Sequence, residues 1–279
     1  MTVKEVLADA RRVLAESSIE EASLEAEVLL RDALRKKRAE LYLALDDELT
    51  PQQRDAFRER LARRLGGEPT AYIVGYREFY GREFLVGPSV LIPRPETELL
   101  VGRALEIARQ HPVSALAEVG TGCGAVAISL ALELPECTVY ATDVSAAALE
   151  VARANCRKHG VTDRVSLLPG DLLETLPEPV DLIVANLPYV RECDVPRTGP
   201  VSREPRLALD GGADGLEQIR RLCWQIEGGV RPGGCLLLEI GMGQAGPVTA
   251  FLRGLFPSAR TDVTPDLGGI DRVVSLMLS

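Results

Sequence analysis

The strongest constraint on the fold is an alternation of apolar runs and helical stretches in the second half of the chain. Five runs of four to six residues have the character of strands buried on both faces: 115–119, 138–141, 165–168, 180–185 and 235–240. Helical patterns over 125–134 and 146–159 separate the first three runs. This alternation predicts a parallel sheet with helices on both faces. A late run, 272–278, is expected to add an antiparallel strand at or near the edge.

The first 65 residues have a different pattern, that of a small helical bundle. Thr2 and Glu5 form a capping-box pattern before apolar residues at helical spacing. Thr50 followed by Pro51 signals the start of another helix. Short apolar-aromatic runs broken by glycines predict a β-hairpin further along. The expected organisation is a helical domain over 1–70, a linker with the hairpin over 71–92, and an α/β domain over 93–279.

Charge and composition narrow the class of function. The formal net charge of −9 weighs against a nucleic-acid partner, because phosphate binding normally requires a basic surface, and it suits a basic protein partner. The six cysteines contain no Cys-x-x-Cys pair, which argues against zinc or a disulfide framework and favours reduced thiols in the cytoplasm. No stretch approaches the ~18 apolar residues of a membrane span, and residues 1–20 lack the apolar core of a secretory signal. We therefore expect a cytoplasmic protein with no bound metal.

A glycine-rich loop follows the first apolar run. Its glycines allow a tight turn and a close approach of the backbone to a ligand, and the next helix offers free N–H groups. Asp143 ends the second run, where a carboxylate can accept hydrogen bonds from ribose hydroxyls. The loop also fits the dinucleotide pattern, but its compact form favours S-adenosylmethionine. Its residues are Gly120, Thr121, Gly122, Cys123 and Gly124.

The tetrapeptide Asn-Leu-Pro-Tyr, residues 186–189, follows the fourth run, where the strand ends open on the ligand crevice. An amide or exocyclic amine nitrogen is a poor nucleophile because its lone pair is delocalised. The Asn186 side-chain oxygen and the Leu187 carbonyl can grasp its two N–H bonds and aim the lone pair at a methyl donor. Pro188 favours an extended Leu187, and Tyr189 can stack on the planar group. The pattern predicts methyl transfer to such a nitrogen, with orientation as the main source of catalysis.

Most of the chain resembles the HemK/PrmC family, the release factor glutamine N5-methyltransferases. The resemblance includes residues 91–98 (Leu-Ile-Pro-Arg-Pro-Glu-Thr-Glu), in which Pro93 to Glu98 form the most specific block. Later blocks are 204–205, 239–241 with Gln244, and 266–269. Two positions depart from the pattern: Leu187 stands where most members have Pro, and Glu118 where many have Asp. The Leu187 departure leaves the backbone acceptor available.

The resemblance implies a Rossmann-like class I methyltransferase with a mostly parallel seven-stranded sheet and a small N-terminal helical bundle. By it, the glycine loop, Asp143 and Asn186 contact S-adenosylmethionine, and Asp171 and Leu172 lie at the adenine. Residues 186–189 would bind the glutamine of the Gly-Gly-Gln motif of class 1 release factors. The helical domain would assist their docking, and the enzyme would be a monomer.

Three other functions fit parts of the pattern. Asn-Leu-Pro-Tyr is also typical of ribosomal RNA adenine N6-methyltransferases, but the acidic balance and the form of the glycine loop weigh against them. A dehydrogenase would need a hydride-transfer site, and neither His111 nor His159 has a suggestive context. A binding module that has lost catalysis would not need an intact loop, acid and tetrapeptide.

The tetrapeptide generates the first prediction. Asn186→Ala removes one of the two acceptors that orient the nitrogen, and a misplacement of about 1 Å can cost about 10²-fold in rate. We expect turnover to fall by at least about that factor, measured as methyl incorporation from labelled cofactor. Methyl transfer by this variant at close to the wild-type rate would refute the assigned role.

Overall fold

The computed structural model describes all 279 residues, which form two compact units. The first unit comprises Met1–Tyr76 together with Arg197–Arg203. The second comprises Arg77–Pro196 together with Glu204–Ser279. None of the helices is both long enough and apolar enough to cross a membrane.

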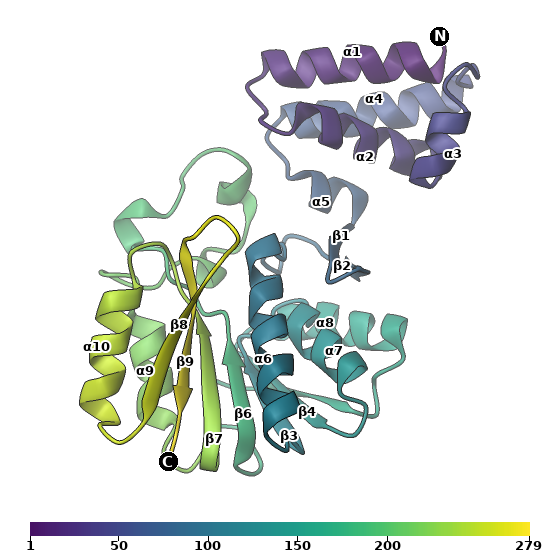
Figure 1. Cartoon of the computed structure of the whole chain (residues 1–279). Helices are drawn as coiled ribbons and strands as arrows, with labels where there is room; N and C mark the ends of the chain where they lie inside the picture. The colour runs from purple at the N-terminus through teal and green to yellow at the C-terminus, as the bar shows by residue number, and fades with distance from the viewer. The chain divides into compact units, whose positions relative to one another are not determined.

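The first unit is a helical bundle around its own apolar core. The Thr2 and Glu5 capping box is present at the start of the first helix. Thr50 caps the fourth helix, whose first residue is Pro51, so both predicted helix starts are confirmed. Its elements are α1 (Val3–Glu16), α2 (Ala22–Leu34), α3 (Arg38–Leu43), α4 (Pro51–Leu65) and α5 (Thr70–Val74), with the 3-10 turn η3 (Pro200–Arg203) (Figure 1).

The second unit contains a seven-stranded sheet in the order β5-β4-β3-β6-β7-β9-β8. The first five strands in this order are parallel, and β9 is antiparallel to both of its neighbours, β7 and β8. The predicted fold class, with its mostly parallel sheet, is confirmed. The strands are β3 (Ala115–Val119), β4 (Thr138–Asp143), β5 (Val165–Pro169), β6 (Val180–Ala185), β7 (Val230–Glu239), β8 (Arg260–Pro265) and β9 (Asp271–Met277).

Helices cover both faces of this sheet (Figure 1). Alternate β3 side chains belong to different faces: Ala115, Ala117 and Val119 share an apolar cluster with α9 and α10, whereas Glu118 contacts the start of α7. The predicted helices over 125–134 and 146–159 are confirmed. The helices are α6 (Glu98–Gln110), α7 (Ala125–Glu133) and α8 (Ala146–His159) on one face, and α9 (Glu217–Gln225) and α10 (Ala245–Leu255) on the other.

The predicted β-hairpin is also present, as β1 (Tyr76–Phe79) and β2 (Arg82–Leu85). After it the chain reaches the short 3-10 turn η1 (Pro95–Thr97), from which α6 begins at Glu98. The remaining 3-10 turns, η2 (Glu192–Asp194) and η4 (Arg206–Ala208), lie in the long segment between β6 and α9.

Two strands depart from the expectation. The strand β8 was not predicted, because its sequence Arg-Thr-Asp-Val-Thr-Pro is polar; it lies at the sheet edge and pairs only with β9. The strand β7 begins at Val230, five residues before the predicted start at 235. The intervening Arg-Pro-Gly-Gly has the composition of a turn, and the register with β6 is irregular there. The late strand β9 is antiparallel and next to the edge, as expected.

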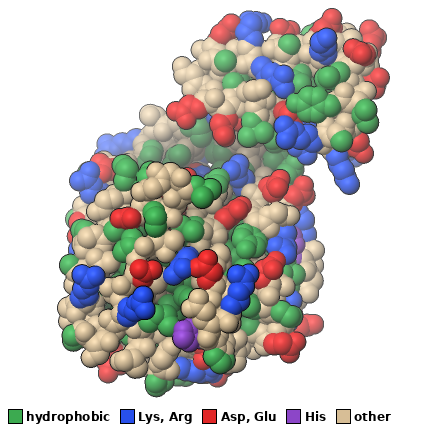
Figure 2. Space-filling model, in the orientation of Figure 1, with side chains coloured by type: hydrophobic (Ala, Val, Ile, Leu, Met, Phe, Trp, Pro, Cys, Tyr) green, Lys and Arg blue, Asp and Glu red, His purple; other side chains and the backbone are tan.

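Charged side chains are distributed over both units. On the face shown in Figure 2, acidic and basic residues are interspersed.

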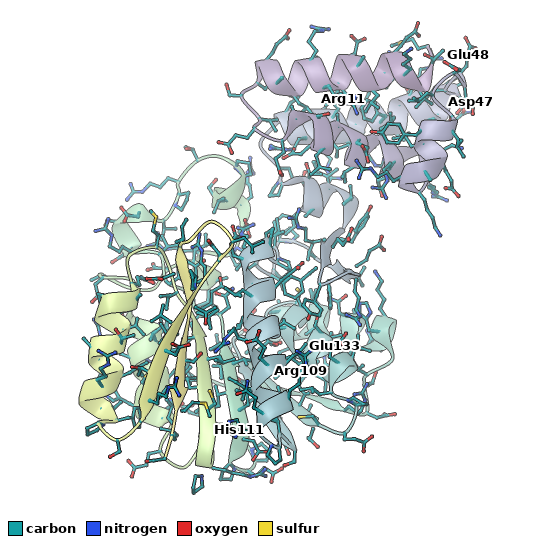
Figure 3. The ribbon with its side chains drawn as sticks, in the orientation of Figure 1. Arg11, Asp47, Glu48, Arg109, His111 and Glu133 are labelled. Carbon is teal, nitrogen blue, oxygen red and sulfur yellow. The ribbon has the colours of Figure 1, made fainter.

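The helix α6 ends at Gln110, and His111 follows it as the capping residue (Figure 3). His111 therefore lies between the end of α6 and the start of β3.

Candidate active site

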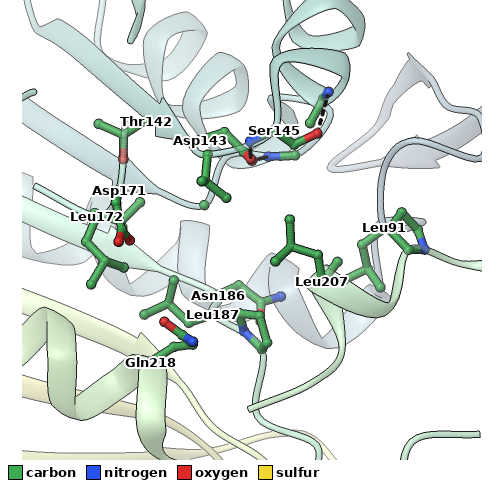
Figure 4. Close-up of a pocket in the computed structure, with 18 of the residues that line it drawn as sticks. Leu91, Thr142, Asp143, Ser145, Asp171, Leu172, Asn186, Leu187, Leu207 and Gln218 are labelled. Carbon is green, nitrogen blue, oxygen red and sulfur yellow. Dashed lines mark hydrogen bonds between the residues drawn. The ribbon is translucent and has the colours of Figure 1, made fainter. Parts of the chain in front are cut away.

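A cavity of about 250 Å³ opens at the carboxyl ends of β3, β4, β5 and β6. Segments 89–91 and 205–210 and two side chains of α9 complete its wall. Figure 4 shows Asn186 and Leu187 across the hollow from Asp143, with Leu172 to one side and Leu207 to the other. Pro188, Gly120 and Gly122 also line the cavity. The topology therefore brings together residues that are as far apart as 89 and 221 in the sequence.

The glycine loop between β3 and α7 needs its glycines for conformation. Gly120, Gly122 and Gly124 have φ values of 75°, 56° and 82°, in the left-handed region that residues with a Cβ rarely adopt. The N–H groups of Gly120 and Thr121 both donate to the Thr142 carbonyl, at 2.9 Å each, which ties the loop to the end of β4. A Cβ on Gly120 would lie 3.3 Å from the Leu187 side chain, so this glycine also permits the tetrapeptide to approach.

Asp143 braces the same loop from the end of β4. Its Oδ2 accepts from the Gly122 N–H at 2.8 Å, and its Oδ1 accepts from the Ser145 N–H at 2.8 Å. Burial raises the pKa of Asp143, although both backbone hydrogen bonds oppose this effect. Each carboxylate oxygen keeps a second lone pair for a hydroxyl in the cavity. Asp143 thus positions the loop and remains available to a ligand.

Glu118 lies beneath the glycine loop and is 5% exposed. Its Oε2 accepts from the Thr121 hydroxyl and, at 2.9 Å, from the Ala127 N–H in the first turn of α7. Burial raises the pKa of Glu118 to about 8. The carboxyl therefore joins the loop to the helix from inside the protein. Nothing in the sequence around Glu118 indicated this function.

Three residues of the glycine loop do not line the cavity. The Thr121 hydroxyl is used by Glu118, and Gly124 is the capping residue before α7. The Cys123 side chain is buried, and burial raises the pKa of its thiol to about 12. A thiol with this pKa stays protonated near neutral pH, which excludes a nucleophilic function there. Asn155 holds the loop by donating to the Cys123 carbonyl at 2.9 Å.

Asp171 and Leu172 follow β5 and line the cavity. Leu172 has φ 54°, a strained conformation for a bulky residue, and is 7% exposed. Asp171 forms an ion pair with Arg221 of α9, which also lines the cavity. Leu172 therefore offers an apolar surface to a ligand, next to a carboxylate that is already paired.

Three of the four residues of the tetrapeptide line the cavity. Asn186, Leu187 and Pro188 line the cavity, whereas Tyr189 does not. The Asn186 Nδ2 donates to the Thr97 hydroxyl oxygen at 3.1 Å. Leu187 is buried, and none of the chain's hydrogen bonds uses its carbonyl oxygen. The two residues whose side-chain oxygen and backbone carbonyl the sequence pattern singled out are therefore both at the cavity.

Tyr189 is half-buried and contacts residues of the β7–α10 segment. Its hydroxyl lies 3.4 Å from the Glu239 Oε1, and its carbonyl accepts from the Gln244 Nε2 at 3.0 Å. The Gln244 Oε1 accepts from the Gly241 N–H at 2.8 Å. Burial and the neighbouring Glu239 raise the pKa of the Tyr189 phenol to about 12. The side chain is therefore a neutral support for the loop and does not form part of the cavity wall.

Two segments outside the sheet, 89–91 and 205–210, also line the cavity and are joined to each other by Glu204. Glu204 is buried, accepts from the Ile92 N–H at 2.9 Å, and forms an ion pair with Arg94. This contact joins the segment before η1 to the segment before η4, which places Leu91 and Leu207 at the cavity. Sequence reasoning assigned no function to these residues or to Thr97, Glu239, Gln244 and Arg221. Several lie in the blocks that carry the family resemblance, which was the available signal.

The parallel sheet, the glycine loop, the acid that follows and the Asn-Leu-Pro-Tyr turn together define a Rossmann-like methyltransferase. Residues 5–75 match the family model of the PrmC N-terminal domain, and residues 97–198 match that of the methyltransferase small domain. The chain belongs to the release factor glutamine methyltransferase family, and the HemK/PrmC resemblance is confirmed.

Two curated relatives match over nearly their full length. A release factor glutamine methyltransferase of Moorella thermoacetica is 44% identical over 98% of this chain and 97% of its own. One of Koribacter versatilis is 40% identical over 98% of each chain. Among solved structures, a ribosomal protein L11 methylase from Lactobacillus delbrueckii is 21% identical, with a TM-score of 0.52 over 73% of this chain and 91% of its own. This last similarity concerns the fold alone.

The burial of Glu118 generates a pH prediction. Its pKa in the folded protein is raised from 4.5 to about 8, so between these values the folded chain holds a proton that the unfolded chain releases. The stability of the wild type should therefore fall as pH rises through this window. Glu118→Gln removes the titration, and its oxygen can still accept from Thr121 and Ala127.

We expect the Tm of Glu118→Gln relative to the wild type to increase by at least about 2 °C between pH 5 and pH 8.5, followed by circular dichroism. The comparison concerns the pH dependence and not the absolute stability of either protein. A Tm difference that is the same at both pH values would contradict the assigned ionisation of Glu118.

Proposed function

We propose that this protein transfers a methyl group from S-adenosylmethionine to the side-chain amide nitrogen, N5, of a glutamine in a release factor. The observation that carries the proposal is that Asn186 and Leu187 line one cavity together with Gly120 and Gly122 of the glycine loop. The names of the curated relatives supply the substrate class. The finer assignment is the glutamine of the Gly-Gly-Gln motif of class 1 release factors, methylated in support of translation termination.

The cavity fits the proposed cofactor. Gly120 and Gly122 bring backbone to the wall, and a Cβ on Gly122 would point into open space. Asp143 is placed to accept from ribose hydroxyls, and Leu172 offers an apolar surface for the adenine. When bound, S-adenosylmethionine would supply a methyl group attached to a positively charged sulfur, and this sulfur would become a neutral thioether when the methyl group is transferred to a nitrogen.

The residues of this chain would then act by orientation. The Asn186 Oδ1 and the Leu187 carbonyl oxygen accept one N–H bond each from the glutamine amide. This pair of hydrogen bonds fixes the amide plane and aims the nitrogen lone pair at the methyl carbon. The nitrogen gains the methyl carbon and subsequently loses one proton to solvent. Pro188 prevents the turn from closing into a helix, which keeps the Leu187 carbonyl in place.

The release factor would also bind to the enzyme outside the cavity. We assign the helical domain the task of docking the release factor, in agreement with its match to a family-specific N-terminal domain. The enzyme would work as a monomer in the cytoplasm, where translation terminates, without direct contact to nucleic acid. The interspersed charges in Figure 2 agree with a protein partner.

Mass spectrometry of a release factor incubated with enzyme and S-adenosylmethionine tests the proposal. We expect a gain of one methyl group on the glutamine of the Gly-Gly-Gln motif. A release factor with this glutamine replaced by alanine is the matched control and should gain none.

A parallel incubation with protein-free ribosomal RNA tests the competing adenine N6 function, because a planar amino group of either kind satisfies the two acceptors. We expect no methyl incorporation into RNA. Transfer to RNA with none to the release factor would overturn the proposal.

A further inference from the structure

We propose that Thr97 and Glu239 are positioning residues that determine which end of the Asn186 amide faces the substrate. The inference rests on the proposed methyl transfer to an amide nitrogen, for which Asn186 must present oxygen and not its NH2 group. The two ends of an asparagine amide are nearly equal in size, so shape cannot select between them. The hydrogen bonds on the far side of Asn186 must make the selection.

Thr97 makes the contact that selects between the two ends of the Asn186 amide. Its hydroxyl oxygen accepts from the Asn186 Nδ2 at 3.1 Å, and the residue is only 5% exposed. Thr97 is the last residue of η1 and has helical φ and ψ, so η1 runs directly into α6 and Thr97 lacks the extended backbone of a usual capping residue. Here the side chain makes no capping hydrogen bond. The hydroxyl is thus directed to Asn186 instead of to the helix that it precedes.

Glu239 determines whether the Thr97 hydroxyl donates a hydrogen bond to Asn186 or accepts one from it. It ends β7 and is 1% exposed, with Oε1 3.4 Å from the Tyr189 hydroxyl and Oε2 buried without a donor of its own. The Thr97 side chain is close enough to the same carboxyl to oppose the rise of its pKa. A carboxylate only accepts, so the Thr97 proton is directed to Glu239 and the Thr97 lone pairs remain for Asn186. A lone pair can receive only the Nδ2 end, which leaves the Asn186 Oδ1 for the substrate.

The ionisation of Glu239 makes this selection sensitive to pH. Burial raises its pKa to about 7, against the contacts with Thr97 and Tyr189 and the charge of Arg272 on β9; Glu96 of η1 adds to the rise. Above this pKa the carboxylate holds the Thr97 proton. Below it the protonated acid can itself donate to Thr97, and the Thr97 hydroxyl is free to donate to Asn186. The reversed amide would then place N–H groups against the N–H groups of the substrate.

The variants that separate positioning from packing are Thr97→Val and Thr97→Ser. Valine keeps the shape and removes the hydroxyl, whereas serine keeps the hydroxyl. We expect Thr97→Val to lower kcat for release factor methylation by about tenfold or more. Thr97→Ser should recover most of the wild-type kcat. The Kd for S-adenosylmethionine, by calorimetry, should change by less than about twofold in both, since Thr97 is absent from the cavity wall.

Glu239→Gln supplies the second, independent variant. We expect the wild-type kcat to rise as pH increases through about 7, since deprotonation completes the network. The variant cannot ionise and should lose this rise while keeping its affinity for the cofactor. A wild-type level of kcat in Thr97→Val, or an unchanged pH profile in Glu239→Gln, would overturn the proposal.

One further measurement does not depend on methyl transfer. The side-chain NH2 resonances of Asn186 can be assigned by NMR from their loss in Asn186→Ala. They should shift with a midpoint near pH 7 in the wild type and not in Glu239→Gln. If the wild type shows this shift but methylates no release factor, the proposed function fails while the network stands. Resonances that do not respond to Glu239 would reject the network itself.

Discussion

The parallel pairing of β3 with β6 is the contact on which the site depends. Its register sets Val119 opposite Ala185, so both strands end at the same level of the sheet. The glycine loop that follows β3 and the turn that follows β6 are therefore neighbours. A Cβ on Gly120 would already lie 3.3 Å from the Leu187 side chain, which shows how closely the two loops pack. A shift of this register by one residue would separate the proposed cofactor contacts from the proposed substrate contacts.

Buried carboxyl groups hold these two loops in place. Glu118 joins the glycine loop to α7, and Glu239 lies behind the turn after β6. Burial of an acid in this environment is unfavourable for its charged form, which is why the pKa of each is raised. Apolar side chains would fill the same space at lower cost, but they could not accept hydrogen bonds from the residues that carry the site. The conformation of the loops thus depends on acids that destabilise the fold near and above neutral pH.

The arrangement also separates the functions that the sequence left open. The cavity wall contains no histidine, tyrosine or lysine, the side chains that a dehydrogenase would need for hydride transfer. The two acceptors at Asn186 and Leu187 suit an adenine amine and a glutamine amide equally. Geometry alone does not choose between these two nitrogens. Membership of the release factor glutamine methyltransferase family, over nearly the whole chain, favours the glutamine.

The sequence by itself determined the parallel sheet, the helical first unit, the glycine loop and the reactive tetrapeptide. These features are local: buried strands form continuous apolar runs, and a loop that needs positive φ needs glycine. The edge strand β8 was missed because its stability comes from pairing with β9 and not from its own polar residues. The early part of β7 was missed because Arg-Pro-Gly-Gly has the composition of a turn.

Only the tertiary structure decided which residues support the site. Thr97, Asn186 and Glu239 are separated by 89 and 53 residues in the chain, yet Asn186 donates to Thr97, and Thr97 lies close enough to Glu239 to affect the pKa of its carboxyl. Likewise, the inward direction of Tyr189 and of Thr121 depends on the acids that they meet. The preference of a polar side chain depends on which partner is nearby in a medium of low polarity, and the folded sheet creates that proximity. The local pattern therefore indicated candidate site residues, whereas the fold determined how they are held.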